Sequence, residues 1–294
     1  MIRHALAFLL VLSSASPLYA QEELPKGWTV GPAVGRLGSK ASVSVPEGVM
    51  FLNAPATKAF LEQNQNIPDG DELGAIVHID AGADYWFAVF TYAESGHVDD
   101  ADRSTIDADA LMTSLKKGSE QGNEERRKRG WDELVLEDWH KAPFYEQATN
   151  NLTWSTRLSS GGSPVINHSV RLLGRTGTMS VQLVADPGGI DSATEQFNAV
   201  LSGYEYTDGQ RYAQFVKGDK LAGYGLTALI AGGAGAAAVK SGLLQKFWKF
   251  LVMIVVAGAA GLKKFFGSRS GHDGSGPRPI PVPPPPPVPP PPSY

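Results

Sequence analysis

Short stretches in which apolar and polar residues alternate predict strands in the middle of the chain. Two of them, residues 151–158 and 178–185, each bring every second residue to one face of a strand. The residues on these faces are Leu152, Trp154, Thr156 and Leu158 in the first, and Met179, Val181 and Leu183 in the second. A third stretch, YWFAVFTY at residues 85–92, is apolar and aromatic almost throughout, which is typical of a central strand.

Glycine-rich turns lie between these strands, at residues 159–164 and 174–177. Tight turns between consecutive strands indicate an antiparallel sheet. Because polar and apolar residues alternate along the strands, we expect one face of this sheet to meet water.

Two segments predict helices. Residues 107–129 begin with acidic residues and end in RRKRG, so that the charges complement the helix dipole at both ends, and Gly118 and Gly122 predict a break in the middle. The second helix, residues 192–202, starts with Ser192 and Glu195 at capping-box spacing. Helices interleaved with antiparallel strands predict an α+β fold, an antiparallel-sheet sandwich.

The hydrophobic pattern changes near the C-terminus. Residues 250–262 are the most hydrophobic run in the chain, but a helix of this length covers roughly 20 Å of the roughly 30 Å of membrane hydrocarbon. A longer helix over residues 243–266 spans the bilayer if Lys246 and Lys249 extend toward the headgroups. We therefore predict a transmembrane anchor at 243–266, with its lipid-facing and interfacial residues at Trp248, Phe250, Leu251, Ile254, Val255 and Leu262.

A Gly/Ala-rich segment precedes this anchor, and we expect residues 217–242 to form a membrane-associated helix. Ala228, Gly232 and Ala236 recur at four-residue spacing, as in small-residue faces on which membrane helices pack closely. Either one crossing near residues 247–266 or a helical hairpin fits the pattern. The positive-inside rule favours one crossing, with Lys263 and Lys264 in the cytoplasm.

The two ends of the chain have their own signatures. Residues 1–20 combine Arg3, a short apolar run and small residues before Ala20, which predicts a secretory signal peptide. Residues 267–294 hold a Gly/Ser joint and a proline-rich tail that predicts a disordered segment and a polyproline II rod. This tail is equally well explained as a ligand for a polyproline-binding partner, as a spacer or as an inert extension.

The balance of charge also changes at residue 217, where the Gly/Ala-rich segment begins. Residues 21–216 hold 16 Lys and Arg against 28 Asp and Glu, whereas the chain from Lys217 onward holds nine against two. An acidic body argues against nucleic acid as a partner, and a basic, apolar C-terminal section favours the lipid bilayer. The chain has no cysteine, which excludes disulfides, thiolate zinc sites and cysteine nucleophiles.

Candidate chemistry is sparse. Trp139, His140 and Tyr145 lie in an aromatic stretch that either stacks on a ligand or packs in the core. Four histidines (His78, His97, His140 and His168) lack metal-binding spacing, and neither a GxSxG nor an SxxK motif is present. We therefore expect no cofactor, no metal site and no recognisable catalytic residue.

Four stretches resemble the bacterial family of membrane-anchored proteins catalogued as domain of unknown function 2167. They are NEERRKRGWDELVLEDWHKAPFY, NLTWSTRL, NHSVRLLGRTG and GQRYAQFVKGDKLAGYGLTALIAGG, which start at residues 123, 151, 167 and 209. The resemblance implies an envelope protein with a signal sequence and a C-terminal anchor, and it assigns no catalytic residue. In outline, the strand-rich body is also similar to PsbP/Mog1-like sandwiches.

These observations predict a non-enzymatic protein of the bacterial inner membrane. Its acidic domain, residues 21–216, is expected to lie in the periplasm and to bind or scaffold a partner that the sequence does not identify, an envelope protein being one possibility. Two alternatives remain: an enzyme with an unrecognised site in the exported domain, and an accessory subunit of a membrane transporter complex.

Overall fold

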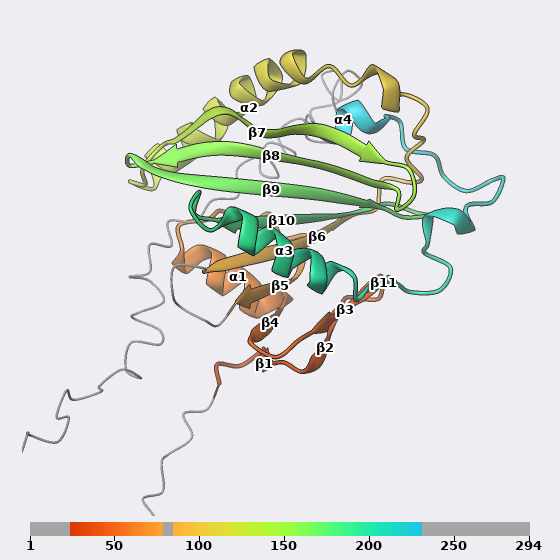
Figure 1. The fold of residues 1–294 in the computed structure, drawn as a ribbon, viewed down its shortest axis with the longest axis horizontal. Coiled ribbons are helices and arrows are strands. Elements are labelled where there is room, and N and C mark those ends of the chain that lie inside the picture. Colours follow the sequence, from red (N-terminus) through yellow and green to blue (C-terminus); the bar gives the residue numbers. More distant parts are fainter. Residues whose placement is uncertain (1–23, 79–84, 231–294) are drawn as a thin grey trace, which may run out of the picture.

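The computed structural model describes residues 24–78 and 85–230 (Figure 1). Its main feature is an antiparallel sheet of eight strands. In spatial order these are β1 (Trp28–Val30), β4 (Val49–Asn53), β5 (Glu72–His78), β6 (Trp86–Ala93), β10 (Thr178–Ala185), β9 (Ser163–Leu173), β8 (Asn151–Ser160) and β7 (Leu134–Glu146). A smaller sheet has the order β11 (Tyr204–Tyr206), β3 (Ala41–Val45) and β2 (Ala33–Leu37). The α+β class with antiparallel sheets is therefore confirmed.

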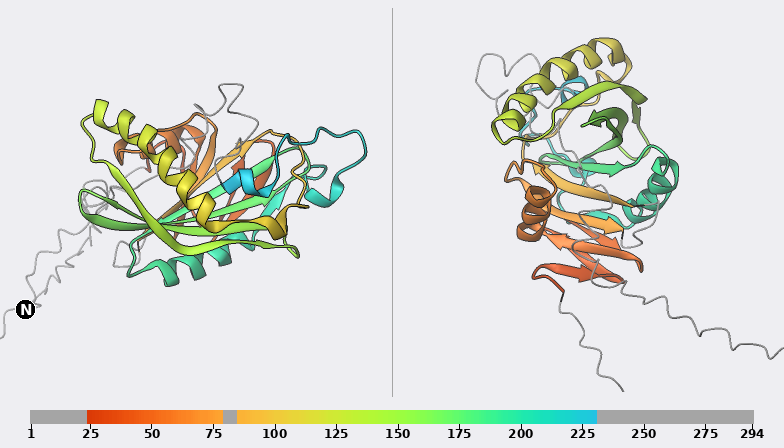
Figure 2. Two further views of the ribbon diagram at one scale, coloured as in Figure 1. Left: turned by 90° about the horizontal axis from the view of Figure 1, so that it is seen from above. Right: turned by 90° about the vertical axis from the view of Figure 1, so that its left-hand side faces the viewer.

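Helices and the small sheet cover both faces of the large sheet. The helices are α1 (Ala54–Gln63), α2 (Ala108–Lys128), α3 (Ile190–Leu201) and α4 (Leu226–Ile230), with 3₁₀ turns at Arg103–Thr105 and Tyr212–Gln214. Figure 2 shows α1 and α3 on opposite sides of the strands, with α2 over β7. We call the two sides the α3 face and the α2 face.

The core has three parts. On the α3 face, residues of the small sheet and α3 pack on β6, β9 and β10. On the α2 face, α1 packs on β4 to β6, and α4 packs on β8 and β9. The expectation that one face of the sheet meets water is wrong. The side chains from Trp86 to Tyr92 have neighbours on both sides of β6, and all of them except Tyr92 are at most 3% exposed. An apolar run without alternation belongs to a strand buried on both faces.

The predicted strands are present, and their faces are as expected. On β10, Met179, Val181 and Leu183 belong to the core of the α3 face. On β8, Leu152, Trp154 and Leu158 belong to the two parts of the core on the α2 face. Tertiary structure thus places the two predicted faces on opposite sides of one sheet.

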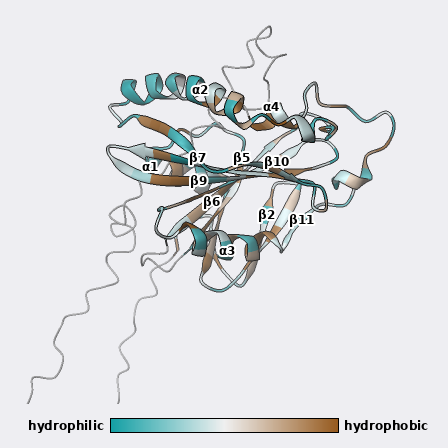
Figure 3. Ribbon diagram, turned by 45° about the horizontal axis from the view of Figure 1, so that its top comes forward, coloured by the Kyte–Doolittle hydropathy of each residue, from teal (hydrophilic) through white to brown (hydrophobic). Residues whose placement is uncertain are grey.

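The first predicted helix is confirmed, but its expected break is wrong. Asp107 caps α2 by accepting hydrogen bonds from the amides of Asp109 and Ala110, and Gly130 follows its end with φ +68°. The helix continues through Gly118 and Gly122, because its packing against β7 compensates for their low helix propensity. Most of α2 is hydrophilic (Figure 3), as expected of a helix that packs through one face.

The capping box predicted for the second helix is wrong. The helix α3 begins at Ile190, two residues before Ser192, and no side chain caps it. The Ser192 hydroxyl instead accepts a 3.4 Å hydrogen bond from the Gln196 side chain, one turn further along. Burial of Ile190 and Ala193 in the core extends the helix past the local signal.

Several predictions lie outside the described residues: the signal peptide (1–20), the anchor (243–266), Gly232, Ala236 and the proline-rich tail (267–294). Within residues 24–78 and 85–230, no helix is long and apolar enough to span a membrane. Ala228 lies in α4, half-buried between residues of the core.

Candidate functional site

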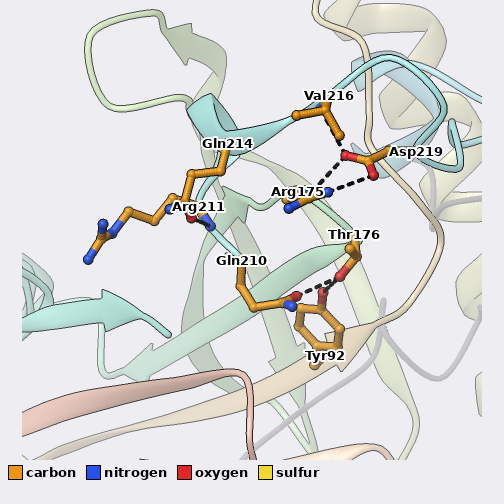
Figure 4. A network of polar contacts seen from close by, with 8 residues as sticks. All are labelled: Tyr92, Arg175, Thr176, Gln210, Arg211, Gln214, Val216 and Asp219. Atoms are coloured by element: carbon orange, nitrogen blue, oxygen red, sulfur yellow. Dashed lines mark hydrogen bonds and ion pairs between the residues drawn. The ribbon is translucent and has the colours of Figure 1, made fainter. Parts of the chain in front are cut away.

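The segment that leads from the last strand to α4 is fastened to the body of the protein. We call residues 209–230 the docking segment. Its contacts join it to the β9–β10 turn (Figure 4) and to the loop after β6. The docking segment overlaps the start of the Gly/Ala-rich segment, residues 217–242, and precedes the predicted anchor at residues 243–266.

An ion pair joins the docking segment to the β9–β10 turn. The Arg175 guanidinium donates two hydrogen bonds to the Asp219 carboxylate, at 2.7 Å and 2.9 Å (Figure 4). A second donor, the amide of Val216, lies 2.9 Å from the same carboxylate. The hydrogen bond from Arg175, followed by that from Val216, lowers the pKa of Asp219 to about 2. The pair is bidentate and therefore fixes direction as well as distance.

Polar contacts extend this attachment toward β6. The Thr176 hydroxyl donates to the Gln210 side chain at 2.7 Å and lies 3.0 Å from the Tyr92 hydroxyl (Figure 4). The backbone amide of Arg175 also donates to the carbonyl of Gln210 at 2.8 Å. The turn GRTG is therefore held through both its side chains and its backbone.

His97 lies between two aromatic rings of the docking segment. Its ring is stacked 4.3 Å from that of Tyr212 and 4.1 Å from that of Phe215. Burial lowers the pKa of His97, although the nearby carboxylates of Asp99 and Asp219 favour the charged form. The imidazole thus serves here as a flat packing element.

Backbone hydrogen bonds continue the attachment. The amide of His97 donates to the carbonyl of Lys220 at 2.8 Å, and the amide of Ala222 donates to the carbonyl of His97 at 2.7 Å. Gly96 permits this approach: its φ is +101°, and a Cβ there would lie 2.7 Å from the Lys220 carbonyl oxygen. Any side chain at this position would push the docking segment away.

Asp102 holds the start of α4. Its carboxylate accepts hydrogen bonds from the amides of Leu226 and Thr227, at 3.0 Å and 3.1 Å. A carboxylate at a helix N-terminus satisfies free amides and complements the helix dipole. The helix then buries three apolar side chains against β8 and β9: Leu226, Leu229 and Ile230.

The structure does not bring the sequence-derived candidates together into one site. Trp139 packs partly buried against the core near α4, where its indole donates to the carbonyl of Ala108 at 3.1 Å. Tyr145 packs against the same core, and its hydroxyl donates to the Asn150 side chain at 3.3 Å. His140 is exposed on β7.

The remaining histidines are also dispersed. His78 stacks on Trp86 at 5.7 Å, and His168 hydrogen-bonds the Ser155 hydroxyl through Nδ1 at 2.8 Å. Among the described residues, no cluster of three or more His, Asp or Glu could hold a metal ion. A pocket of about 370 Å³ on the α3 face is lined by His168, Lys141, Phe144 and residues of α3.

Sequence reasoning did not identify the docking contacts. Many of the residues that make them lie in the motifs NHSVRLLGRTG and GQRYAQFVKGDKLAGYG, whereas His97 and Asp102 lie outside both. Charge and spacing alone do not pair residues such as Arg175 and Asp219 across 44 positions. The available signal was the presence of Gly and Arg in the turn at residues 174–177 and of Gly and Asp at residues 218–219, outside the regular elements.

Comparisons with solved structures find distant likenesses. One is cyanobacterial PsbP (CyanoP) from Synechocystis, with 12% identity and a TM-score of 0.35 over 57% of this chain and 86% of that one. Another is LpqN, described as involved in cell envelope biogenesis of Mycobacterium tuberculosis, with 13% identity and a TM-score of 0.31 over 59% of this chain and 87% of that one. Among curated proteins, none matches this sequence.

A family model matches most of the chain. The match runs over residues 30–263, and its description is "Protein of unknown function (DUF2167)". It includes both motifs that fasten the docking segment to the body. On this evidence, the chain belongs to the DUF2167 family.

Proposed function

We propose that this chain is a non-enzymatic, membrane-anchored protein of the bacterial envelope, whose exported domain binds or scaffolds a partner at a set orientation to the bilayer. The observation that carries the proposal is the attachment of residues 209–230 to the body. A protein that only needed a tether would be served by a flexible linker before its anchor. Here residues 209–230, which precede the predicted anchor, carry an ion pair, an aromatic stack and a capped helix.

Several independent contacts act on a short length of chain, and this supports a fixed orientation. The docking segment is held at its start by the pairing of Gln210 with the β9–β10 turn, in its middle by Asp219, and at its end by Asp102. These three contacts hold residues 209–230 against the body along their whole length, which supports a defined exit direction for the chain toward the predicted anchor. A presenting or scaffolding protein benefits from this because its partner then meets one face only.

The acidic charge of the body suits this role. Residues 21–216 carry a formal excess of acidic over basic residues, 28 against 16. Anionic headgroups repel such a surface, whereas the basic flanks of the predicted anchor are attracted to them. We expect the body to stand away from the bilayer, accessible to a partner in the same compartment.

The membrane topology is tested by cysteine labelling, for which the cysteine-free chain provides a clean background. Single cysteines replace Ser163, Ser241 and Ser293, and intact spheroplasts are treated with a membrane-impermeant maleimide. Labelling at 163 and 241 but not at 293 is expected for one crossing near residues 247–266. Labelling at 163 and 293 but not at 241 would instead mean a hairpin. An unlabelled cysteine at 163 would contradict export of the body.

The scaffolding role is tested by photo-crosslinking in living cells. A photoreactive residue at exposed positions of the body, such as Val135 or Val34, is expected to yield a discrete crosslinked product. Replacing Arg175 by Met loosens the docking segment without touching those positions, and it should reduce the yield although the protein still reaches the membrane. An unchanged yield in that variant would contradict the need for a set orientation.

A further inference from the structure

A loop at one end of the body exposes apolar and basic side chains together. We call residues 216–221, with the sequence VKGDKL, the tip loop. The side chains of Val216 and Leu221 are 53% and 58% exposed, and the two lysines between them are exposed as well. Figure 1 shows the cyan segment that leads to α4 projecting beyond the end of the large sheet, and the left view of Figure 2 shows the same projection.

The tip loop is held in this conformation by contacts with its own backbone and with the body. The Asp219 amide donates to the carbonyl of Val216 at 3.0 Å, and the Val216 amide donates to the Asp219 carboxylate at 2.9 Å. Between them, Gly218 has φ +107°. Arg175 and the backbone of His97 fasten the loop to the body. Because the loop is already fixed, a partner that binds it pays little ordering entropy.

The charge of the tip loop is positive, although the body as a whole is acidic. The carboxylate within the loop, that of Asp219, is neutralised by the Arg175 guanidinium at 2.7 Å. In the part of the chain that the structure describes, neither Lys217 nor Lys220 forms an ion pair. Both ammonium groups are therefore available to an anionic surface.

A lipid surface fits this combination of side chains. Lysines are attracted to anionic headgroups, and apolar side chains beside them enter the boundary between headgroups and acyl chains. The core of a protein–protein interface, in contrast, is depleted of lysine.

The position of the tip loop in the chain also favours the bilayer. Twelve residues, 231–242, separate the end of α4 from the predicted anchor. A chain of this length keeps α4 within roughly 45 Å of the anchor. A contact between the tip loop and the bilayer is then intramolecular in effect, so a small contact area is sufficient.

We propose that the tip loop is a membrane-surface contact, in which Val216 and Leu221 enter the headgroup boundary and Lys217 and Lys220 bind lipid phosphate groups. The inference rests on the proposed membrane-anchored role and deepens it, because a second attachment beside the anchor sets the orientation of the body. The contact is confined to the tip loop, so the acidic remainder of the body still stands away from the bilayer.

The opposite end of the large sheet offers a reference position. Arg211, which precedes the tip loop, pairs with Gly174 directly after β9, whereas Val135 of β7 pairs with Ser159 near the other end of β8. The strand β8 has ten residues, which span roughly 30 Å. Val135 is exposed, so a label there and a label at Val216 compare the two ends of the body.

The test uses the full chain in vesicles of phosphatidylglycerol and phosphatidylcholine. A single cysteine replaces Val216 or, in a separate protein, Val135, and carries an environment-sensitive fluorophore; the chain has no other cysteine. Spin-labelled phosphatidylcholine is expected to quench the label at 216 strongly and the label at 135 weakly. If Val216→Cys does not fold, Leu221→Cys gives the same reading. Equal quenching at the two ends would overturn the proposal.

Paired substitutions test the lysines. In the labelled Val216→Cys protein, Lys217→Gln with Lys220→Gln is expected to lower the quenching by roughly half, because the attraction to anionic lipid is lost. The matched control is Lys116→Gln with Lys117→Gln, two exposed lysines of α2, which should leave the quenching unchanged. The same decrease with both pairs would contradict a contact made by the tip loop.

Flotation of the same vesicles separates this inference from the proposed anchor. Protein that floats with the lipid but shows no quenching at 216 retains the anchor and refutes the contact. Protein that does not float refutes the anchor, and the contact with it. A label at 216 that is shielded from aqueous iodide but not quenched by lipid would mean that a protein covers the tip loop, which also overturns the proposal.

Discussion

At the scale of single residues, His168 couples the stability of the body to pH. Burial, together with the positive charges of Lys141 and His140, lowers the pKa of His168 to about 4. In the unfolded chain the pKa of histidine is about 6.5. As pH falls from about 6.5 to about 4, the unfolded chain therefore takes up a proton that the folded chain does not. The free energy of unfolding should fall by about 3 kcal/mol over this range.

Replacing His168 by Asn should flatten this part of the stability profile. Urea unfolding at pH 7 and pH 4 measures the difference for the wild type and the variant. The matched control is His140→Asn, at an exposed position on β7, two strands away from β9 in the sheet, which should leave most of the pH dependence in place. Equal slopes for wild type and His168→Asn would show that other groups carry the effect.

Asp219 acts in a lower pH window. Its pKa in the folded protein, about 2, lies below the value of about 3.9 for an unfolded aspartate. The stabilisation by its ion pair is therefore complete above about pH 4 and is lost as pH falls toward 2. Asp219→Asn should lower the unfolding free energy at pH 6 and lose less stability than the wild type between pH 4 and pH 2. A variant with the wild-type profile in that interval would refute the ion pair.

At the scale of elements, the cap of α4 determines whether the docking segment is held at its end. Asp102→Ala removes the acceptor for the amides of Leu226 and Thr227 and should cost about 1 kcal/mol. Hydrogen exchange of these two amides should become fast in the variant. The measurement is NMR or mass spectrometry of exchange at neutral pH.

The matched control is Asp107→Ala, which removes the cap of α2. Its carboxylate accepts from the amides of Asp109 and Ala110 in the same way, so a similar loss of stability is expected. In this variant the amides of Leu226 and Thr227 should stay protected. Equal protection of α4 in both variants would mean that packing alone holds the helix.

At the scale of the whole molecule, the docking segment completes the core. Leu226, Leu229 and Ile230 pack on Leu152 and Trp154 of the large sheet. A fragment of residues 24–230 should therefore be monomeric, whereas a fragment of residues 24–208 should expose this apolar surface and bind a hydrophobic dye. Dye fluorescence and size-exclusion chromatography measure the difference. Identical behaviour of the two fragments would show that the segment is dispensable for the fold.

Local pattern predicted individual elements well. Alternation along β8 and β10 and the charges at the two ends of α2 are properties of adjacent residues, so they can be read without the fold. The helix α1 was not predicted, although Asn53 caps it and Pro55 lies in its first turn. Its apolar face is short, and only contact with Phe87 and its neighbours in the core makes it evident.

The sequence by itself determined the class of fold, the family and the division into an acidic body and a basic, apolar C-terminal section. These depend on composition and on periods of two and 3.6 residues, which arise from backbone geometry. Only the tertiary structure decided that both faces of the sheet are covered, that Arg175 meets Asp219, that Asp102 caps a helix 124 positions later and that Arg171 is buried. Such contacts follow from how distant segments pack, and no local period carries that information.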